Sequence, residues 1–327
     1  MTVLVTGATG FVGSAVARHL LEAGASVAVL VRSNSDRRNL DDLNVEIREG
    51  DLRDKRSLER ACSGCDTLFH VAADYRLWTR DHRDLYASNV DGTRNIMRAA
   101  LESAVAKIVY TSSVATLGTN SDGTPGNEST PVIIEDMIGH YKRSKYLAER
   151  AVDDLVSEHG LPAVIVNPST PVGPGDIKPT PTGRVVRDAQ AGKIPAYVDT
   201  GLNIAHVDDV AAGHLLALDK GQIGRRYILG GENLSLREIL SNIAEICGRA
   251  PPRIKLPRRL VFPIAYVSEA WAWITDGAEP QATVDGLKMA RKKMFFDSSR
   301  AIDELNYHAR PESEALADAV AWFRSVS

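Results

Sequence analysis

The sequence lacks the features that would mark a secreted, membrane-spanning or nucleic-acid-binding protein. It has three cysteines in 327 residues, too few for a disulfide framework, and we therefore expect a reducing, cytoplasmic protein. The formal net charge of −3 gives no global basic field, which argues against a nucleic-acid partner. No apolar run reaches the length of a membrane span, and charged residues arrive too early for a signal peptide.

Two of the cysteines, Cys62 and Cys65, form a C-x-x-C pair. A redox or zinc site would need an adjoining helix start or two more ligands. Only Cys247 remains, and no histidine pair stands at ligand spacing. We therefore expect a turn between a helix and a strand at this pair, and no metal site.

The sequence begins with MTVLVTGATGFVG, the stretch around which the rest is organised. Thr2–Thr6 is β-branched and apolar like a buried strand, and it runs into Gly7, Gly10 and Gly13 before a helical pattern starts. Strand, glycine-rich turn and helix together are the setting in which a dinucleotide's pyrophosphate binds. The spacing is G-x-x-G-x-x-G rather than G-x-G-x-x-G, and a plain turn is the alternative interpretation.

The second strand, Ser26–Val31, ends at Arg32. An acidic residue there would bind the ribose of NAD, whereas an arginine suits the 2′-phosphate of NADP. We therefore expect NADP as the cofactor, with NAD as the alternative. Arg37 and Arg38 could add to this phosphate site, and the alternative is that Arg32 is a solvated loop charge.

Two further strand ends suit a cofactor. Asp51 follows the third strand, where an adenine ring would lie, and Ala72 and Ala73 end the fourth strand. Small residues let a cofactor lie close to the backbone, and ligands of open α/β sheets bind at this edge.

Strands and helices alternate through the first half of the chain. We expect strands at Thr2–Thr6, Ser26–Val31, Val45–Arg48, Thr67–Ala73, Lys107–Thr111 and Leu161–Asn167, and helices at Ser57–Ala61, Leu85–Ala104 and Met137–Ser157. This alternation predicts an α/β fold, a Rossmann-type doubly wound parallel sheet with helices on both faces.

The pattern changes after Asn167. Five prolines between residues 168 and 181 make regular structure unexpected there, and such a loop could cover a site. The remaining elements are expected to be strands at Leu202–Val207 and Arg226–Leu229 and helices at Val210–Leu218, Leu236–Cys247, Gln281–Arg291 and Glu312–Ser325. We expect residues 1–167, with about 202–224, to form the NAD(P)-binding domain. Residues 168–201 and 225–327 then form a smaller, discontinuous α+β substrate lobe.

The helix expected from Met137 carries Tyr141 and Lys145, which are four residues apart and share a helix face. A neighbouring ammonium favours the phenolate and lowers the pKa of a tyrosine, so Tyr141 could exchange a proton with a substrate oxygen near neutral pH. Ser113, at the end of the fifth strand, is placed to bond the same oxygen. Lys145 can also hold the nicotinamide ribose.

Together these segments resemble the extended short-chain dehydrogenases/reductases of the NAD-dependent epimerase/dehydratase family. The motifs that carry the resemblance are Thr6–Gly13, Asp51-Leu52, His70–Ala73, Asn89–Thr93, Thr111–Ser113, Tyr141 with Lys145, and His206–Val210. The resemblance implies a catalytic triad of Ser113, Tyr141 and Lys145. It also implies a homodimer through the long helices that begin at Leu85 and Met137. The cofactor-binding residues that it implies, beyond those derived above, are Thr9, Phe11, Val12, Leu52, Thr111, Pro168 and Val172.

Within that family the chain is similar to the dihydroflavonol-4-reductase-like branch, whose usual preference for NADP fits Arg32. More narrowly, three segments resemble the bacterial hopanoid-associated sugar epimerases: Ala72–Trp78, Gly139–Tyr141 and Asn167–Pro174. That resemblance implies a sugar, a polyol or a lipid-linked sugar as substrate.

The candidate substrate residues surround the expected site. Tyr75, Arg76 and Trp78 follow the fourth strand directly, and Arg184 lies in the proline-rich cover. Two arginines could clamp a phosphate, and an indole could stack on a sugar or a base. His140, which precedes the catalytic tyrosine, is a further candidate for substrate contact. The alternative is that the two arginines are solvated surface charges and that His140 is structural.

The segment Leu256–Ile274 is aromatic and follows a basic stretch. Such a segment can lie on a membrane surface, although aromatic residues at helical spacing are more often part of a core. We expect a core helix and keep weak peripheral membrane contact as the alternative.

These observations predict an NADP-dependent oxidoreductase acting on a secondary alcohol or ketone. A sugar epimerase or reductase linked to hopanoid lipid biosynthesis is the leading interpretation, and a dihydroflavonol-reductase-like carbonyl reductase is the alternative. A non-catalytic NADP-binding regulatory protein is the rival of another class. The core motifs do not separate epimerase from reductase.

Overall fold

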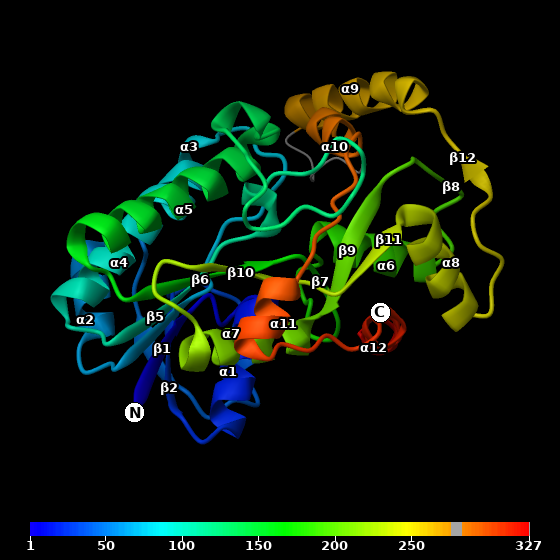
Figure 1. The fold of residues 1–327 in the computed structure, drawn as a ribbon. Helices are drawn as coiled ribbons and strands as arrows, with labels where there is room; N and C mark the ends of the chain where they lie inside the picture. The colour runs from blue at the N-terminus through cyan, green and yellow to red at the C-terminus, as the bar shows by residue number, and fades with distance from the viewer. Residues whose placement is uncertain (276–282, 327) are drawn as a thin grey trace.

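The computed structural model describes residues 1–275 and 283–326, and Figure 1 shows their arrangement. The strands are β1 Thr2–Thr6, β2 Ser26–Val31, β3 Glu46–Glu49, β4 Thr67–His70, β5 Lys107–Thr111, β6 Ala163–Pro168, β7 Thr170–Val172, β8 Ala196–Tyr197, β9 Gly201–His206, β10 Arg226–Leu229, β11 Glu232–Ser235 and β12 Ile254–Lys255. The α-helices are α1 Phe11–Glu22, α2 Lys55–Cys62, α3 Arg83–Tyr86, α4 Gly92–Glu102, α5 Gly139–His159, α6 Pro181–Gln190, α7 Val207–Lys220, α8 Leu236–Ile246, α9 Arg258–Thr275, α10 Val284–Met289, α11 Ser299–Leu305 and α12 Glu312–Ser325.

The largest layer is a seven-stranded parallel sheet in the order β10-β6-β5-β4-β1-β2-β3. Side chains alternate across it, as the strand period of two requires. Val3 and Val5 of β1 join the core under α1 and α7, whereas Leu4 joins the core under α2, α4 and α5. The strand order reverses direction between β1 and β4, and ligands of this fold bind at the carboxyl ends of the strands there. The Rossmann-type doubly wound fold is thus confirmed.

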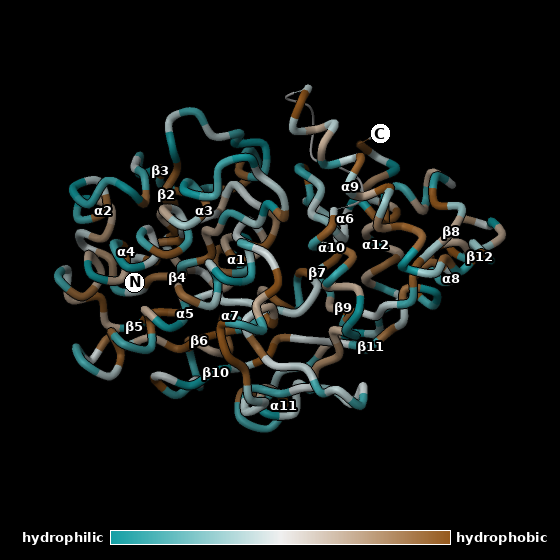
Figure 2. Tube along the Cα trace, turned by 90° about the horizontal axis from the view of Figure 1, so that it is seen from above, coloured by the Kyte–Doolittle hydropathy of each residue, from teal (hydrophilic) through white to brown (hydrophobic). Residues whose placement is uncertain are grey.

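A smaller lobe stands beside the carboxyl ends of this sheet (Figure 2). Its centre is a three-stranded sheet in the order β11-β9-β7, packed against α6, α8 and α12. Val172, Ile204, Ile239 and Phe323 are among the apolar residues buried between these elements. The helices α9 and α10 pack on each other at one edge of the lobe (Figure 1).

Three elements differ from the sequence-based expectation. Arg226–Leu229, expected in the substrate lobe, is β10 and pairs with β6 at the edge of the large sheet. Strand β4 stops at His70 rather than Ala73. The Ala72 N–H donates to the side-chain hydroxyl of Thr6 at 3.2 Å rather than to a backbone carbonyl of a neighbouring strand. The helix expected at Leu85–Ala104 is α3, a π-helical turn over Ala87–Asp91, and α4.

The proline-rich region was also expected to lack regular structure, and this was wrong. Strand β7 spans Pro171, and it lies at the edge of its sheet, where a missing N–H is tolerated. Helix α6 begins at Pro181, a position where the fixed φ of proline favours a helix start. The helix expected at Gln281–Arg291 is α10, Val284–Met289, and its expected start at residues 281–282 lies outside the described residues.

Candidate active site

The glycine-rich turn brings β1, α1 and the end of β4 into close contact. Gly7 has φ +77°, and a Cβ there would lie 2.6 Å from the Ala72 nitrogen. A Cβ on Gly13 would lie 2.1 Å from the Gly7 carbonyl oxygen, so larger residues would push α1 away from the turn. Helix α1 has Gly10 as its N-cap, no side-chain cap and no acidic residue in its first turn. This backbone cradle with its free N–H groups fits a pyrophosphate.

The charges at the ends of β2 and β3 distinguish Arg32 from its neighbours. Arg37 pairs with Glu49 at 2.9 Å and Arg38 pairs with Asp36 at 2.7 Å. Arg32 is exposed at the end of β2. Arg37 and Arg38, which were expected to add to a ribose-phosphate site, thus pair with neighbouring carboxylates. Of these three arginines, Arg32 stays the candidate for that phosphate.

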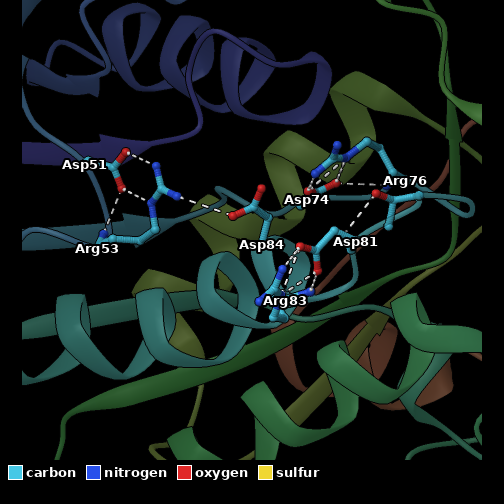
Figure 3. A network of polar contacts seen from close by, with 8 residues as sticks. Asp51, Arg53, Asp74, Arg76, Asp81, Arg83 and Asp84 are labelled. Atoms are coloured by element: carbon cyan, nitrogen blue, oxygen red, sulfur yellow. Dashed lines mark hydrogen bonds and ion pairs between the residues drawn. The ribbon is translucent and has the colours of Figure 1, made fainter. Parts of the chain in front are cut away.

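Asp51 and Leu52 follow β3, and the Asp51 carboxylate is bonded by Arg53, which also approaches Asp84 at 3.6 Å (Figure 3). The backbone carbonyl of Leu52 accepts a hydrogen bond from Asn95 of α4 at 3.0 Å. This loop is therefore held against α4, and its expected contact with an adenine ring stays a prediction. On the other side of the turn, the Thr9 carbonyl accepts a hydrogen bond from Asn39 at 3.3 Å.

Lys145 is buried in α5, with 3% of its surface exposed, and its Nζ donates to the backbone oxygen of Thr111 at 2.9 Å. Burial lowers the pKa of its ammonium to about 8, and the carboxylate of Glu149 opposes this shift. The pKa of the Tyr141 phenol was expected to be lowered by Lys145, but burial raises it in this structure, and a hydrogen bond with Ser113 acts against that rise. The three residues of the expected triad thus meet at the carboxyl end of β5.

A buried polar network lies beneath Ser113, and the sequence analysis did not find it. The side-chain amide of Asn167 donates to the Ser113 carbonyl at 3.1 Å and to Glu149 at 2.9 Å. Thr116 donates to the Ser113 carbonyl at 2.8 Å, and Arg226 pairs with Glu149 at 2.8 Å. Glu149 could have been suspected because it follows Lys145 by four residues and so shares its helix face.

A second missed set holds the segment after β4. The Asn89 side chain, in the π-helical turn, bonds the backbone N–H and carbonyl of Asp74 at 2.7 and 2.8 Å and the Ser144 hydroxyl at 3.0 Å. His70 is fully buried between Thr6 at 2.7 Å and Thr93 at 3.0 Å. Burial lowers the pKa of His70 to about 3, so the ring is neutral and serves as a structural link.

Comparison with known proteins decides the family. The model of the NAD dependent epimerase/dehydratase family matches residues 3–230, which is more than half of the chain.

The chain belongs to the NAD dependent epimerase/dehydratase family.

It is an enzyme of the extended short-chain dehydrogenase/reductase type, as the motifs imply. A putative dihydroflavonol 4-reductase of Synechocystis is 46% identical over 325 residues, covering 98% of this chain and 94% of the relative. The sterol demethylase protein B of Methylococcus capsulatus is 37% identical, covering 99% and 98%. The crystal structure of gox2253 matches with a TM-score of 0.90 and 55% identity, covering 100% of this chain and 98% of the other.

In this member of the epimerase/dehydratase family, the candidate substrate residues have partners within the protein. Arg76 pairs with Asp74 at 2.5 Å (Figure 3). The Tyr75 hydroxyl donates to the Lys178 carbonyl at 3.1 Å, which links the loop after β4 to the segment before α6. Trp78 and Arg184 are half-buried. The contact of these side chains with a substrate stays a prediction.

His140 is engaged on the α3 side of α5. Its ring stacks on His82 with 3.6 Å between the centroids, and its Nδ1 lies 3.1 Å from the Tyr86 hydroxyl. On the opposite side of the site, Pro168 ends β6 and Val172 is buried in β7. Strand β6 pairs with β5, and the expected contact of Pro168 and Val172 with the nicotinamide stays a prediction.

The cysteine pair forms a turn, in which the Cys65 N–H bonds the Cys62 carbonyl at 3.1 Å. Burial raises the pKa of the Cys62 thiol to about 12, which suppresses thiolate chemistry. Across residues 1–275 and 283–326, no group of three or more His, Cys, Asp or Glu side chains could hold a metal ion. None of the helices in this part of the chain is long and apolar enough to cross a membrane.

Proposed function

We propose that the protein is an NADP(H)-dependent oxidoreductase that interconverts a secondary alcohol and a ketone. The observation that carries this proposal is the placement of Ser113, Tyr141 and Lys145 at the carboxyl end of β5. The glycine-rich turn at Gly7 opens onto the same edge of the sheet. A proton-transfer group and a dinucleotide cradle thus share one edge, as hydride transfer to a carbonyl requires.

The roles of the three side chains follow from their geometry. The bound nicotinamide supplies or accepts the hydride. Tyr141 gives a proton to the substrate oxygen during reduction and takes it back during oxidation. Ser113 bonds the same oxygen, and we propose that the positive charge of Lys145 opposes the rise that burial causes in the pKa of Tyr141. Asn167 and Thr116 fix the backbone of Ser113 from below, so this hydroxyl is preorganised for its role.

The preference for NADP rests on Arg32. It is the exposed cation at the end of β2, while Arg37 and Arg38 are paired with carboxylates. A guanidinium binds a phosphate through charge-assisted hydrogen bonds. We propose NADP rather than NAD on this basis.

The substrate is proposed to be an apolar or lipid-linked alcohol or ketone, with hopanoid lipid biosynthesis as its setting. A cavity of about 150 Å³ begins at Ala115, two residues after Ser113, and at Lys142, directly after Tyr141. Its lining is mixed, because the apolar Met137, Met289 and Met294 stand beside the charged Asp136, Lys142 and Lys292. Methionine adapts to apolar groups of irregular shape, and the charged side chains suit polar groups on the same ligand. The names of the two curated relatives, a reductase and a sterol demethylase protein, support a reductase acting on such compounds.

An epimerase that returns its hydride to the same substrate is the second candidate. The description of the matching family favours it, and both reactions share the first hydride transfer.

The homodimer proposed for the chain would pair α4 and α5 of two copies. Sedimentation of the purified protein at several concentrations tests this assembly, and a monomer throughout would contradict it.

The experiment that tests the function uses NADPH deuterated at the transferred position, with a panel of apolar ketones and sugar-linked alcohols. A reductase places one deuterium in its product and consumes one NADPH per turnover. An epimerase, assayed with the alcohols and NADP+ instead, converts one epimer into the other without net formation of NADPH. No conversion of any compound, with NADPH bound tightly, would favour the non-catalytic regulatory protein.

A further inference from the structure

Helix α9 is apolar on two faces, and only one of them is covered. Val261 and Ala265 pack toward Val284 and Leu287 in a small core shared with α10. A second stripe faces solvent and repeats at intervals of four and three residues, the spacing of one helix face. It consists of Leu260, Ile264, Val267, Trp271 and Ile274, which are 62 to 74% exposed.

This stripe differs from the other exposed apolar side chains. Away from α9 and the chain ends, the exposed large apolar residues of the described chain are Ile47, Tyr75, Ile133, Ile223, Ile254 and Ile302, which are scattered over separate elements. Such isolated residues are normal on a soluble surface, whereas a contiguous patch marks an interaction site. Tyr266 and Trp273 are also more than half exposed on α9, so the helix joins aromatic and aliphatic side chains in one surface.

Among the residues that the structure describes, the charges around α9 are predominantly positive. Arg253 and Arg259 are exposed near its start, and Arg291, Lys292 and Lys293 are exposed after α10. Asp199 and Asp285 pair with two further lysines, Lys255 and Lys288, at 2.8 and 3.2 Å. The positive excess contrasts with the net charge of −3 of the whole chain.

The acidic residue of α9, Glu269, is turned toward the protein. Its carboxylate accepts a hydrogen bond from the backbone N–H of Val284 at 2.7 Å, at the start of α10. The outward stripe of α9 therefore carries no carboxylate. A basic, aromatic helix face of this kind matches an anionic lipid surface.

The position of α9 connects this surface to the segment that follows β4. Arg80, in the segment after β4, donates to the Ala272 carbonyl at 3.4 Å, and its guanidinium lies 5.8 Å from the centre of the Trp273 ring. The same segment carries Tyr75 and Trp78, which are candidate substrate residues. Figure 1 shows α9 along the outer edge of the molecule with α10 on its inner side.

We infer that α9 docks the protein on an anionic lipid membrane, with the stripe from Leu260 to Ile274 in the interface and the flanking cations against the headgroups. A second copy of the chain fits the same stripe less well. Paired helices with this spacing use opposite charges along the edges of the stripe, but the cations around α9 would face one another and repel. The docked helix lies in the membrane surface, since no described helix can span a bilayer.

The test uses the full chain and vesicles without substrate, so its outcome is independent of the proposed reaction. Flotation at low salt compares vesicles of phosphatidylcholine alone with vesicles containing 30% phosphatidylglycerol as an added anionic lipid. We expect binding to the anionic vesicles, at least tenfold weaker binding to the neutral ones, and loss of most binding in high salt. Equal binding to both vesicle types, or none, would overturn the inference.

Two variants and a matched control assign the effect to α9. The double change Val267→Glu with Trp271→Glu places carboxylates on the exposed stripe and is expected to reduce vesicle binding at least tenfold. Ile223→Glu changes a similarly exposed isoleucine elsewhere and is expected to bind like the wild type. NADPH titration verifies that each variant is folded. A wild-type dimer in sedimentation that the double change converts to a monomer would assign the stripe to a second copy instead.

Discussion

The ammonium of Lys145 donates a hydrogen bond to the backbone carbonyl of Thr111, with 2.9 Å between Nζ and O. This contact joins α5 to the end of β5, next to Ser113. The lysine is therefore a structural link between these two elements, and we propose that its positive charge also acts on Tyr141. Burying its ammonium also lowers the free energy of unfolding by an amount that can be measured.

Replacing Lys145 by methionine should change the pH dependence of folding. The folded-state pKa of about 8 lies below the ordinary lysine value of 10.5, so the unfolded chain binds the proton more tightly between these pH values. Wild-type stability should therefore rise with pH across this window, relative to Lys145→Met, by at most about 1.4 kcal/mol per pH unit. Below pH 8 the difference between the two proteins should be constant.

Urea denaturation at pH 7, 8, 9 and 10 measures this difference. Lys107→Met is the matched control, because Lys107 is an exposed lysine at the start of β5, the strand whose last residue Lys145 contacts. Its unfolding free energy should run parallel to that of the wild type. If the unfolding free energies of Lys145→Met and the wild type changed with pH in parallel, this would contradict the claim that the Lys145 ammonium is buried.

Replacing Glu149 by glutamine should affect both folding and catalysis. Glu149 is buried and paired with Arg226, and removing one partner of a buried pair costs roughly 3 kcal/mol. Its carboxylate also raises the pKa of Lys145, so the alkaline limit of the kcat profile should move to lower pH.

Asp153→Asn is the control for the Glu149 variant. Asp153 also contacts Arg226 but is more exposed than Glu149, so the loss of stability should be smaller and the pH limit of kcat should stay in place. Urea titrations and pH–rate profiles of the two variants make the comparison. If the pH profile of kcat were not shifted in Glu149→Gln, this would contradict the prediction that Glu149 sets the alkaline limit through the pKa of Lys145.

Arg32→Asp should change the choice of cofactor. Losing a charge-assisted contact to the 2′-phosphate is expected to weaken NADPH binding by roughly 10- to 100-fold, with NADH binding retained or improved. Fluorescence titration with both nucleotides measures the ratio. Arg38→Gln removes a nearby arginine that is already paired with Asp36, and its ratio should match the wild type. An unchanged ratio in Arg32→Asp would make Arg32 a surface charge and favour NAD.

The sequence predicts most of the nucleotide-binding half because its signals are local. The apolar run before Gly7, the spacing of Tyr141 and Lys145 and the serine after β5 each depend on a few neighbouring residues. The family model confirms the resulting fold and enzyme class. Local patterns also place nearly every strand of the large sheet within a few residues.

The remaining features depend on contacts between distant segments. The residues of Arg226–Leu229 predict a strand, but they do not predict whether this strand pairs with β6 or with the smaller lobe. The pairing of Glu149 with Arg226 follows from that strand order. The spacing from Lys145 could therefore point to Glu149, but the sequence could not predict its partners under Ser113. The second apolar stripe of α9 resembled a core helix in sequence, because periodicity shows that a face is apolar and not whether it is covered.

The measurement that most directly tests the central claim is deuterium transfer from labelled NADPH by the wild type and by Tyr141→Phe. The variant lacks the proton donor but keeps the cradle at Gly7, so NADPH should bind with nearly unchanged affinity. The account predicts that transfer to the substrate falls by roughly 10² to 10⁴ in rate. Transfer at the wild-type rate by Tyr141→Phe would contradict the assignment of Tyr141 as the proton donor, and with it the proposed site.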